Sequence, residues 1–166
     1  LTNVITHTRI DPGRVIIEVT ETSVMSAPDE SIATLEALKT RFPEMLIAID
    51  DFGTGYSSLS YLTRLPVDII KIDLSFVSNL FVQDNEKIVQ AILHLGASLG
   101  KKVVAEGVET PEQREFFVGK GCFAVQGYHF FRPVPAAEIP QLLMGGSASI
   151  HREVGTRQLP RDAEPA

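Results

Sequence analysis

Acidic residues recur at the ends of the apolar segments of this sequence. Residues 46–49 run directly into two adjacent carboxylates, Asp50 and Asp51. Like charges this close raise one another's pKa unless a cation lies between them. Other apolar segments also end in acids, which complete a candidate rim of carboxylates: Glu18, Asp73 and Glu106. We therefore expect a cation site at these residues.

The chemistry open to these acids is that of hard divalent cations. Carboxylate oxygens without clustered Cys or His suit Mg²⁺ or Mn²⁺ rather than zinc. Two such ions would lower the pKa of a bound water and leave a positive face for a phosphate. Lys71 shares a strand face with Asp73, so its ammonium is expected to orient the water or to contact a phosphate. For any single acid, the alternative is a solvated strand end.

Five apolar segments alternate with helical ones. We predict strands at 15–19, 46–49, 69–73, 103–106 and 122–125. We predict helices at 1–10, from Pro28 to before Pro43, at 57–65, at 85–99, from Pro111 with Thr110 as N-cap, and at 135–144. Apolar strands separated by helices indicate a parallel sheet whose strand ends meet at one rim. Both a (β/α) barrel and an open doubly wound sheet satisfy this pattern.

Composition limits the possible partners. The chain of 166 residues has a formal net charge of −6, which argues against binding a DNA or RNA polymer or a membrane surface. Its single cysteine excludes an intrachain disulfide and fits a reducing compartment. No apolar run approaches the roughly 18 residues that a transmembrane helix needs. We expect a cytoplasmic domain of a larger protein, which could be membrane-anchored through other domains.

Five segments carry a family resemblance. They are residues 18–22, 50–62, 68–73, 103–110 and 126–128. In this order they resemble the EAL domain, the bacterial phosphodiesterase module that linearises cyclic di-GMP. The resemblance implies an α/β fold, a (β/α)8 TIM-like barrel present here as an incomplete barrel of about five strands. Residues 1–146 would form the C-terminal part of this barrel, and residues 147–166 a mobile tail or linker.

The resemblance also implies roles for the rim residues. Carboxylates would bind two Mg²⁺ or Mn²⁺ ions: Glu18, Asp50, Asp51 and Glu106. Polar side chains would face the substrate: Gln126, Asp73 and Glu109. Lys71 would hold the attacking water, and Glu106 would help to activate it. Glu21 would anchor the loop 52–58, which in the family links the metal site to dimer contacts.

The family's signature Glu-Ala-Leu segment and the Asn-bearing strand after it are taken to be absent from this chain, and both supply metal ligands in the family. We expect that part of the domain to lie outside this chain, and we expect the isolated chain to hydrolyse cyclic di-GMP weakly or not at all. Open sheet edges recruit partners, so a homodimer is expected. A sensory or GGDEF domain is a further candidate partner within the parent protein.

Three other functions remain open at this stage. A non-catalytic cyclic di-GMP receptor would keep the nucleotide site without cutting the ligand. A degenerate EAL interaction module would serve assembly alone. A phosphoacceptor receiver domain also combines an acid pair with a lysine, but there the acid pair comes first in the domain and the lysine last. Here Lys71 follows the pair by about twenty positions, with two predicted strands still to come.

Overall fold

The computed structural model describes residues 1–55 and 59–150. It divides into two compact units, the first covering Leu1–Phe131 and the second beginning at Arg132. The first unit holds the sheet and every residue of the candidate rim.

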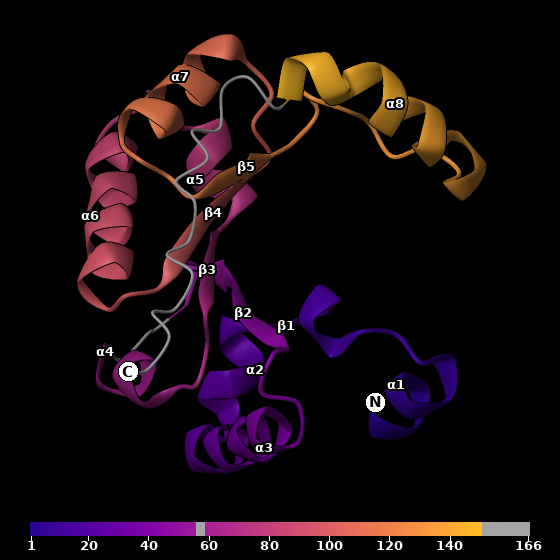
Figure 1. Ribbon diagram of the computed structural model, residues 1–166. Helices are drawn as coiled ribbons and strands as arrows, with labels where there is room; N and C mark the ends of the chain where they lie inside the picture. Colours follow the sequence, from indigo (N-terminus) through magenta and orange to yellow (C-terminus); the bar gives the residue numbers. More distant parts are fainter. Residues whose placement is uncertain (56–58, 151–166) are drawn as a thin grey trace, which may run out of the picture. The chain divides into compact units, whose positions relative to one another are not determined.

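The sheet contains five parallel strands in chain order (Figure 1). They are β1 (Ile16–Thr20), β2 (Leu46–Phe52), β3 (Ile69–Ile72), β4 (Lys102–Glu106) and β5 (Ala124–Gln126). Each strand pairs with the next one along the chain. A doubly wound sheet reverses its strand order at a switch point, and this sheet does not. The order therefore decides between the two architectures that the sequence left open, in favour of the barrel type.

Helices connect the strands of the first unit. They are α1 (Thr2–Thr8), α2 (Glu21–Ser26), α3 (Pro28–Arg41), α4 (Leu59–Arg64), α5 (Leu74–Ser78), α6 (Asn85–Ser98) and α7 (Pro111–Gly119). A short 3₁₀ turn, η1 (Pro12–Arg14), precedes β1. Thr110 caps α7 with a complete capping box, as its position before Pro111 predicted.

The strand register separates two faces of the sheet. Paired residues on neighbouring parallel strands point to the same side, and alternate residues point to opposite sides. One side carries the apolar core under the helices, including Ile47, Ile49, Ile70, Ile72 and Ala105. The other side carries polar residues toward the strand ends, and we call it the rim face: Glu18, Asp50, Lys71, Glu106 and Gln126.

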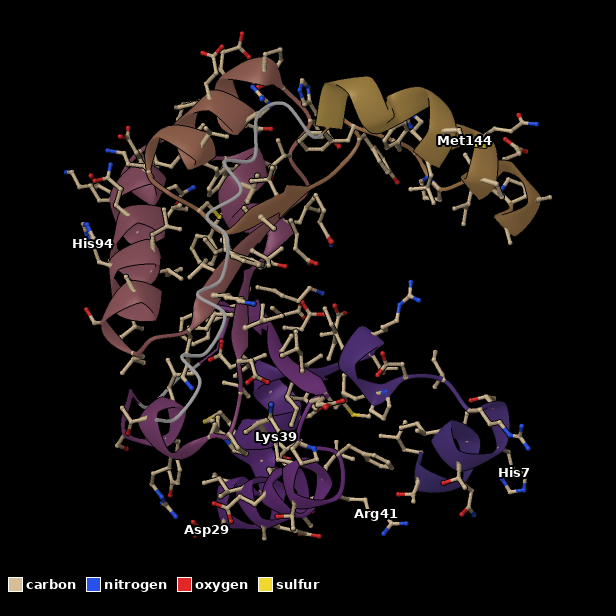
Figure 2. All side chains as sticks on the ribbon, in the orientation of Figure 1. His7, Asp29, Lys39, Arg41, His94 and Met144 are labelled. Carbon is tan, nitrogen blue, oxygen red and sulfur yellow. The ribbon has the colours of Figure 1, made fainter. Side chains whose placement is uncertain are left out.

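A second polar contact fixes the opposite end of β2. Asp68 Oδ2 accepts a hydrogen bond from Ile47 N at 2.8 Å and lies 2.6 Å from Lys39 Nζ. Lys39 also donates to Met45 O at 2.8 Å. In Figure 2, Lys39 lies between α3 and the strands, whereas Arg41 of the same helix points away from them. These bonds tie α3 to the start of β2 and to the residue before β3.

Two short helices were missed by sequence reasoning. Helix α2 begins directly at the end of β1, where Thr20 accepts a hydrogen bond from Ser23 N at 3.3 Å. Helix α5 begins directly after β3, where Asp73 accepts from Ser75 N at 2.9 Å. Both helices have six residues or fewer, too short to show a helical period, and their N-caps look in sequence like polar strand ends.

The second unit contains η2 (Ala136–Glu138) and α8 (Ile139–Ile150). The helix predicted at 135–144 is present but begins later and reaches Ile150. The rest of the predicted tail, residues 151–166, lies outside the described residues.

Candidate active site

Lys71 is the centre of the rim. Its Nζ lies 2.7 Å from Glu18 Oε2, 3.0 Å from Asp50 Oδ1 and 2.7 Å from Glu106 Oε1. The lysine side chain is only 7 % exposed, whereas the Glu18 side chain is 48 % exposed. Carboxylates from three different strands thus converge on one buried ammonium, whereas the sequence analysis expected a metal ion between the acids.

A β-bulge places both members of the acid pair on the rim. Ile49 pairs with Ile70 and Phe52 pairs with Ile72, so two residues of β2 oppose one residue of β3. The two residues are Asp50 and Asp51, and the opposing residue is Lys71. Asp51 has a φ of 56°, a conformation that Asp tolerates better than most residues. In a regular strand the two carboxylates would have pointed to opposite faces.

The acids concentrate negative charge at this point. Burial raises the pKa of Asp51, and the carboxylates of Asp50 and Asp73 raise it further. Burial also raises the pKa of Glu106, although the Lys71 ammonium partly offsets this. Burial alone would lower the pKa of Lys71, but hydrogen bonds to the three carboxylates outweigh burial and raise it well above its ordinary value. Lys71 is therefore charged at every ordinary pH.

Gln126 and Asp73 lie at the same rim. Gln126 Nε2 donates to Glu106 Oε1 at 2.5 Å, so the amide and Lys71 share one carboxylate oxygen. Asp73 accepts bonds from the backbone N and the hydroxyl of Ser75, which makes it the N-cap of α5 as well as a neighbour of Asp51. Glu109 is exposed on the loop after β4.

Glu21 is fully buried at the start of α2. Its Oε2 accepts a hydrogen bond from Gly53 N at 2.8 Å. A Cβ at Gly55 would lie 2.8 Å from Glu21 Oε1, so only glycine fits there without a shift of the carboxylate. Glu21 thus holds the start of the loop that follows the acid pair. The remainder of the predicted loop, residues 56–58, lies outside the described residues.

Gln113 is a site residue that sequence reasoning missed. It is 6 % exposed, and its Oε1 accepts from Glu109 N at 2.8 Å and Thr110 N at 3.1 Å. Its Nε2 donates to Val77 O at 2.9 Å, in α5. The side chain therefore joins the loop after β4 to the helix after β3. The spacing Thr110-x-x-Gln113, a capping-box pattern, was the sequence signal available.

Comparison with known proteins agrees with this geometry. The EAL domain family matches residues 1–133. The chain belongs to the EAL domain family. MucR of Pseudomonas aeruginosa, a bifunctional diguanylate cyclase/cyclic di-GMP phosphodiesterase, is 45% identical over 138 residues, 82% of this chain and 20% of MucR. RocR of the same organism, a cyclic di-GMP phosphodiesterase, is 39% identical over 132 residues, 79% of this chain and 33% of RocR. This EAL chain thus spans a fifth to a third of these two relatives.

Solved EAL structures have the same fold. The c-di-GMP complex of the PaMucR phosphodiesterase superposes with a TM-score of 0.79 at 45% identity, covering 83% of this chain and 56% of that one. The manganese/cy-diGMP complex of Klebsiella pneumoniae BlrP1 at pH 6 gives a TM-score of 0.70 at 40% identity, covering 79% of this chain and 33% of that one. The expected fold class, an α/β sheet of the EAL barrel type with five strands, is confirmed.

The donor set fits divalent metal ions in its chemistry. Glu18, Asp50, Asp51 and Glu106 supply only carboxylate oxygens, the ligands that Mg²⁺ and Mn²⁺ prefer. Burial is the largest cause of the raised pKa values of Asp51 and Glu106, neighbouring carboxylates add to it, and a bound cation would lower both pKa values. Among the described residues, no three His, Cys, Asp or Glu side chains are arranged to hold an ion, and the Lys71 ammonium lies between the acids instead.

A Glu-Ala-Leu triplet does occur in this EAL chain, at residues 36–38. It lies in α3, where Glu36 is exposed, and not at a strand end. The triplet therefore cannot supply the rim carboxylate for which the family is named. Its position, rather than its sequence, separates it from the family's signature strand.

Proposed function

We propose that the EAL domain to which this chain belongs hydrolyses cyclic di-GMP to linear pGpG with two Mg²⁺ or Mn²⁺ ions. One observation carries the proposal: the buried Lys71 ammonium held by Glu18, Asp50 and Glu106 at the carboxyl ends of three parallel strands. Active sites of (β/α) barrels lie at this end. The relatives whose names include phosphodiesterase support the same reaction.

Each side chain has a distinct part in this proposal. Carboxylates bind the ions: Glu18, Asp50, Asp51 and Glu106. When bound, the ions lower the pKa of a water and neutralise the phosphate. Lys71 orients that water, and Glu106 accepts its proton, because the pKa of Glu106 is already raised by burial. The water oxygen bonds to phosphorus, the P–O3′ bond breaks, and the proton ends on the released 3′ oxygen.

Other residues hold the ligand and the loops. Gln126 donates to Glu106, and in this proposal its amide binds the nucleotide together with Asp73 and Glu109. Glu21 keeps the loop after the acid pair in position through Gly53 N. A homodimer through that loop, and a sensory or GGDEF domain elsewhere in the parent protein, remain part of the proposal. A cytoplasmic location is also part of the proposal. Within the described residues, no helix combines the length and the apolar character needed to cross a bilayer.

The receptor function is the second candidate. Its support is the placement of Lys71 between the acids, with no described trio of ligands arranged for an ion. In this case the site would bind cyclic di-GMP without cutting it. The proposed metal-binding carboxylates also do not include the Glu-Ala-Leu and Asn ligands that the resemblance implies. We therefore expect weak or no turnover from these 166 residues alone.

The test uses the complete EAL domain of the parent protein and the chain itself. Cyclic di-GMP is incubated with Mg²⁺, Mn²⁺ or EDTA, and pGpG is measured by chromatography. We expect metal-dependent pGpG formation by the complete domain and its loss in Glu106→Gln, while the exposed Lys87→Ala control keeps full activity. Calorimetric binding of cyclic di-GMP without cleavage by the complete domain would establish the receptor instead, and absence of both would refute each candidate.

A further inference from the structure

A cavity lies at the end of β4 opposite the rim. Its volume is about 320 Å³, at the lower end of the range for small-ligand sites. Its polar lining comes from α6, the start of β4 and the turn after α7: Gln90, His94, Lys101, Lys102 and Lys120. Figure 2 labels His94 on α6. Lys102 is the first residue of β4 and Glu106 the last, so the cavity lies about 13 Å from the rim along the strand.

The lysines of the chain divide into two groups. One group has carboxylate partners: Lys39 with Asp68, Lys71 with the rim acids, and Lys87 with Asp84. The other group has no ion pair with any described residue, and all of its members line this cavity: Lys101, Lys102 and Lys120. In a chain with a net charge of −6, unpaired lysines gathered at one cavity mark a place for an external anion.

Each of the three ammonium groups also contacts a neighbouring element of the fold. Lys101 Nζ donates to Val67 O at 2.8 Å, which fixes it in the wall. Lys102 Nζ lies 4.5 Å from the centre of the Phe123 ring, and Lys120 Nζ lies 5.7 Å from that of Phe116. Burial lowers the pKa of Lys101, and the attraction of Asp68 offsets only part of that lowering. An anion in the cavity would relieve the desolvation of this charge.

The lining also indicates what the anion carries. No carboxylate is among the residues that line the cavity. Of the acids near it, Asp68 pairs with Lys39 at 2.6 Å, and Glu86 accepts a hydrogen bond from Gln90 Nε2 at 2.9 Å. Phe123 lines the cavity with a side chain that is 51% exposed, and a flat apolar group can cover its ring. Lysine ammonium groups bind phosphate as point charges.

We propose that this cavity binds a small phosphate monoester of about nucleotide size, with its phosphate on Lys102 and Lys120 and its flat group on Phe123. The site is separate from the catalytic rim. It does not depend on the proposed function, and it needs no metal ion.

The test is an NMR titration of the chain with AMP, inorganic phosphate and adenosine in buffer with EDTA. We expect AMP to shift the amide signals of Ala97, Gly121 and Phe123, with phosphate binding more weakly and adenosine not at all. The double variant Lys102→Ala/Lys120→Ala should lose at least about tenfold in affinity for AMP. The matched control is Lys87→Ala, whose side chain is 81% exposed on α6 and paired with Asp84, and which should bind as the unchanged chain does.

Two results would overturn the proposal. One is AMP binding of equal strength in the double variant and the control. The other is a set of shifts confined to Glu106 and Gln126, which would assign the nucleotide to the rim. Phe123→Ala tests the aromatic contact separately, and it should weaken AMP binding while leaving phosphate binding unchanged. If AMP and phosphate bound the unchanged chain with equal affinity, the aromatic contact would be refuted. Native-like amide dispersion in each variant shows that the fold is kept.

Discussion

Replacing Lys71 by methionine removes the only cation that the structure places among the rim acids in the described residues. Methionine keeps much of the buried side-chain volume, so the change is mainly one of charge. Three carboxylates then face one another without the ammonium that now lies within 3.0 Å of each. Removal of one partner from a buried ion pair costs about 3–5 kcal/mol. Because Glu18 is about half exposed and screened by water, we expect the lower figure, about 3 kcal/mol.

The assay is urea or thermal unfolding of the chain near pH 7. For a protein of this size, a loss of about 3 kcal/mol lowers the Tm by about 6–12 °C. Lys87→Met is the matched control, because that ion pair is 81% and 74% exposed and should contribute less than about 1 kcal/mol. Mg²⁺ or Mn²⁺ should restore part of the stability of Lys71→Met, since a bound cation replaces the missing charge.

Unfolding at acid pH provides an independent check that the loss of stability in Lys71→Met is electrostatic. Without Lys71, Glu106 loses the partner that lowers its pKa, so Glu106 takes up a proton at a higher pH than in the unchanged chain. The stability difference between the two proteins should therefore shrink as the pH falls. A Lys71→Met variant as stable as the unchanged chain at pH 7, with no response to either metal, would refute the electrostatic account of the rim.

Three further predictions concern Gln113, Gly127 and Cys122. Gln113→Leu should lower the unfolding free energy by about 3 kcal/mol in urea, because it leaves the buried Val77 O and the part-buried Glu109 N and Thr110 N without their partner. An unchanged urea midpoint would contradict this. Gly127→Ala should lower the unfolding free energy by more than about 3 kcal/mol, because the new Cβ would lie 2.2 Å from Val108 O. As a control, a Cβ at Gly119 meets nothing within 4 Å, so Gly119→Ala should be neutral or slightly stabilising. Burial raises the pKa of Cys122 from 9.0 to about 11, so the protonated thiol favours the folded state. The unfolding free energy should therefore fall by about 3 kcal/mol as the pH rises between these two values. Urea unfolding at each pH should show that this fall is absent in Cys122→Ala.

The sequence predicted all five strands, and it identified acids within or directly after four of them. It did so because parallel strands buried under helices are continuous apolar runs, and the polar residue after each run is visible as a break. The register then brings Glu18, Lys71 and Glu106 onto one face without any further signal. For the same reason Thr110 was identified as a cap, since Pro at the first helical position marks the start of a helix.

Features that depend on contacts between distant segments were not predicted from the sequence. The bulge that turns both Asp50 and Asp51 toward Lys71 arises from pairing with β3, and the residues themselves look like ordinary strand residues. Gln113 reads as a polar residue in the first turn of a helix, and only the tertiary structure shows that it bonds to Val77 O in α5. Strand β2 also extends through the acid pair to Phe52 rather than ending at Ile49, because the bulge lets pairing resume.

Strand β4 connects the two proposed sites. It begins with Lys102, at the cavity of unpaired lysines, and ends with Glu106, at the rim of acids. Both side chains belong to the same face, because they are four residues apart on one strand. The two ends therefore attract opposite ligands, a phosphate at the start of the strand and a cation at its end. The ends lie about 13 Å apart along the strand, and the rim charges are largely buried, so salt screens them incompletely and we expect each ligand to favour the binding of the other slightly.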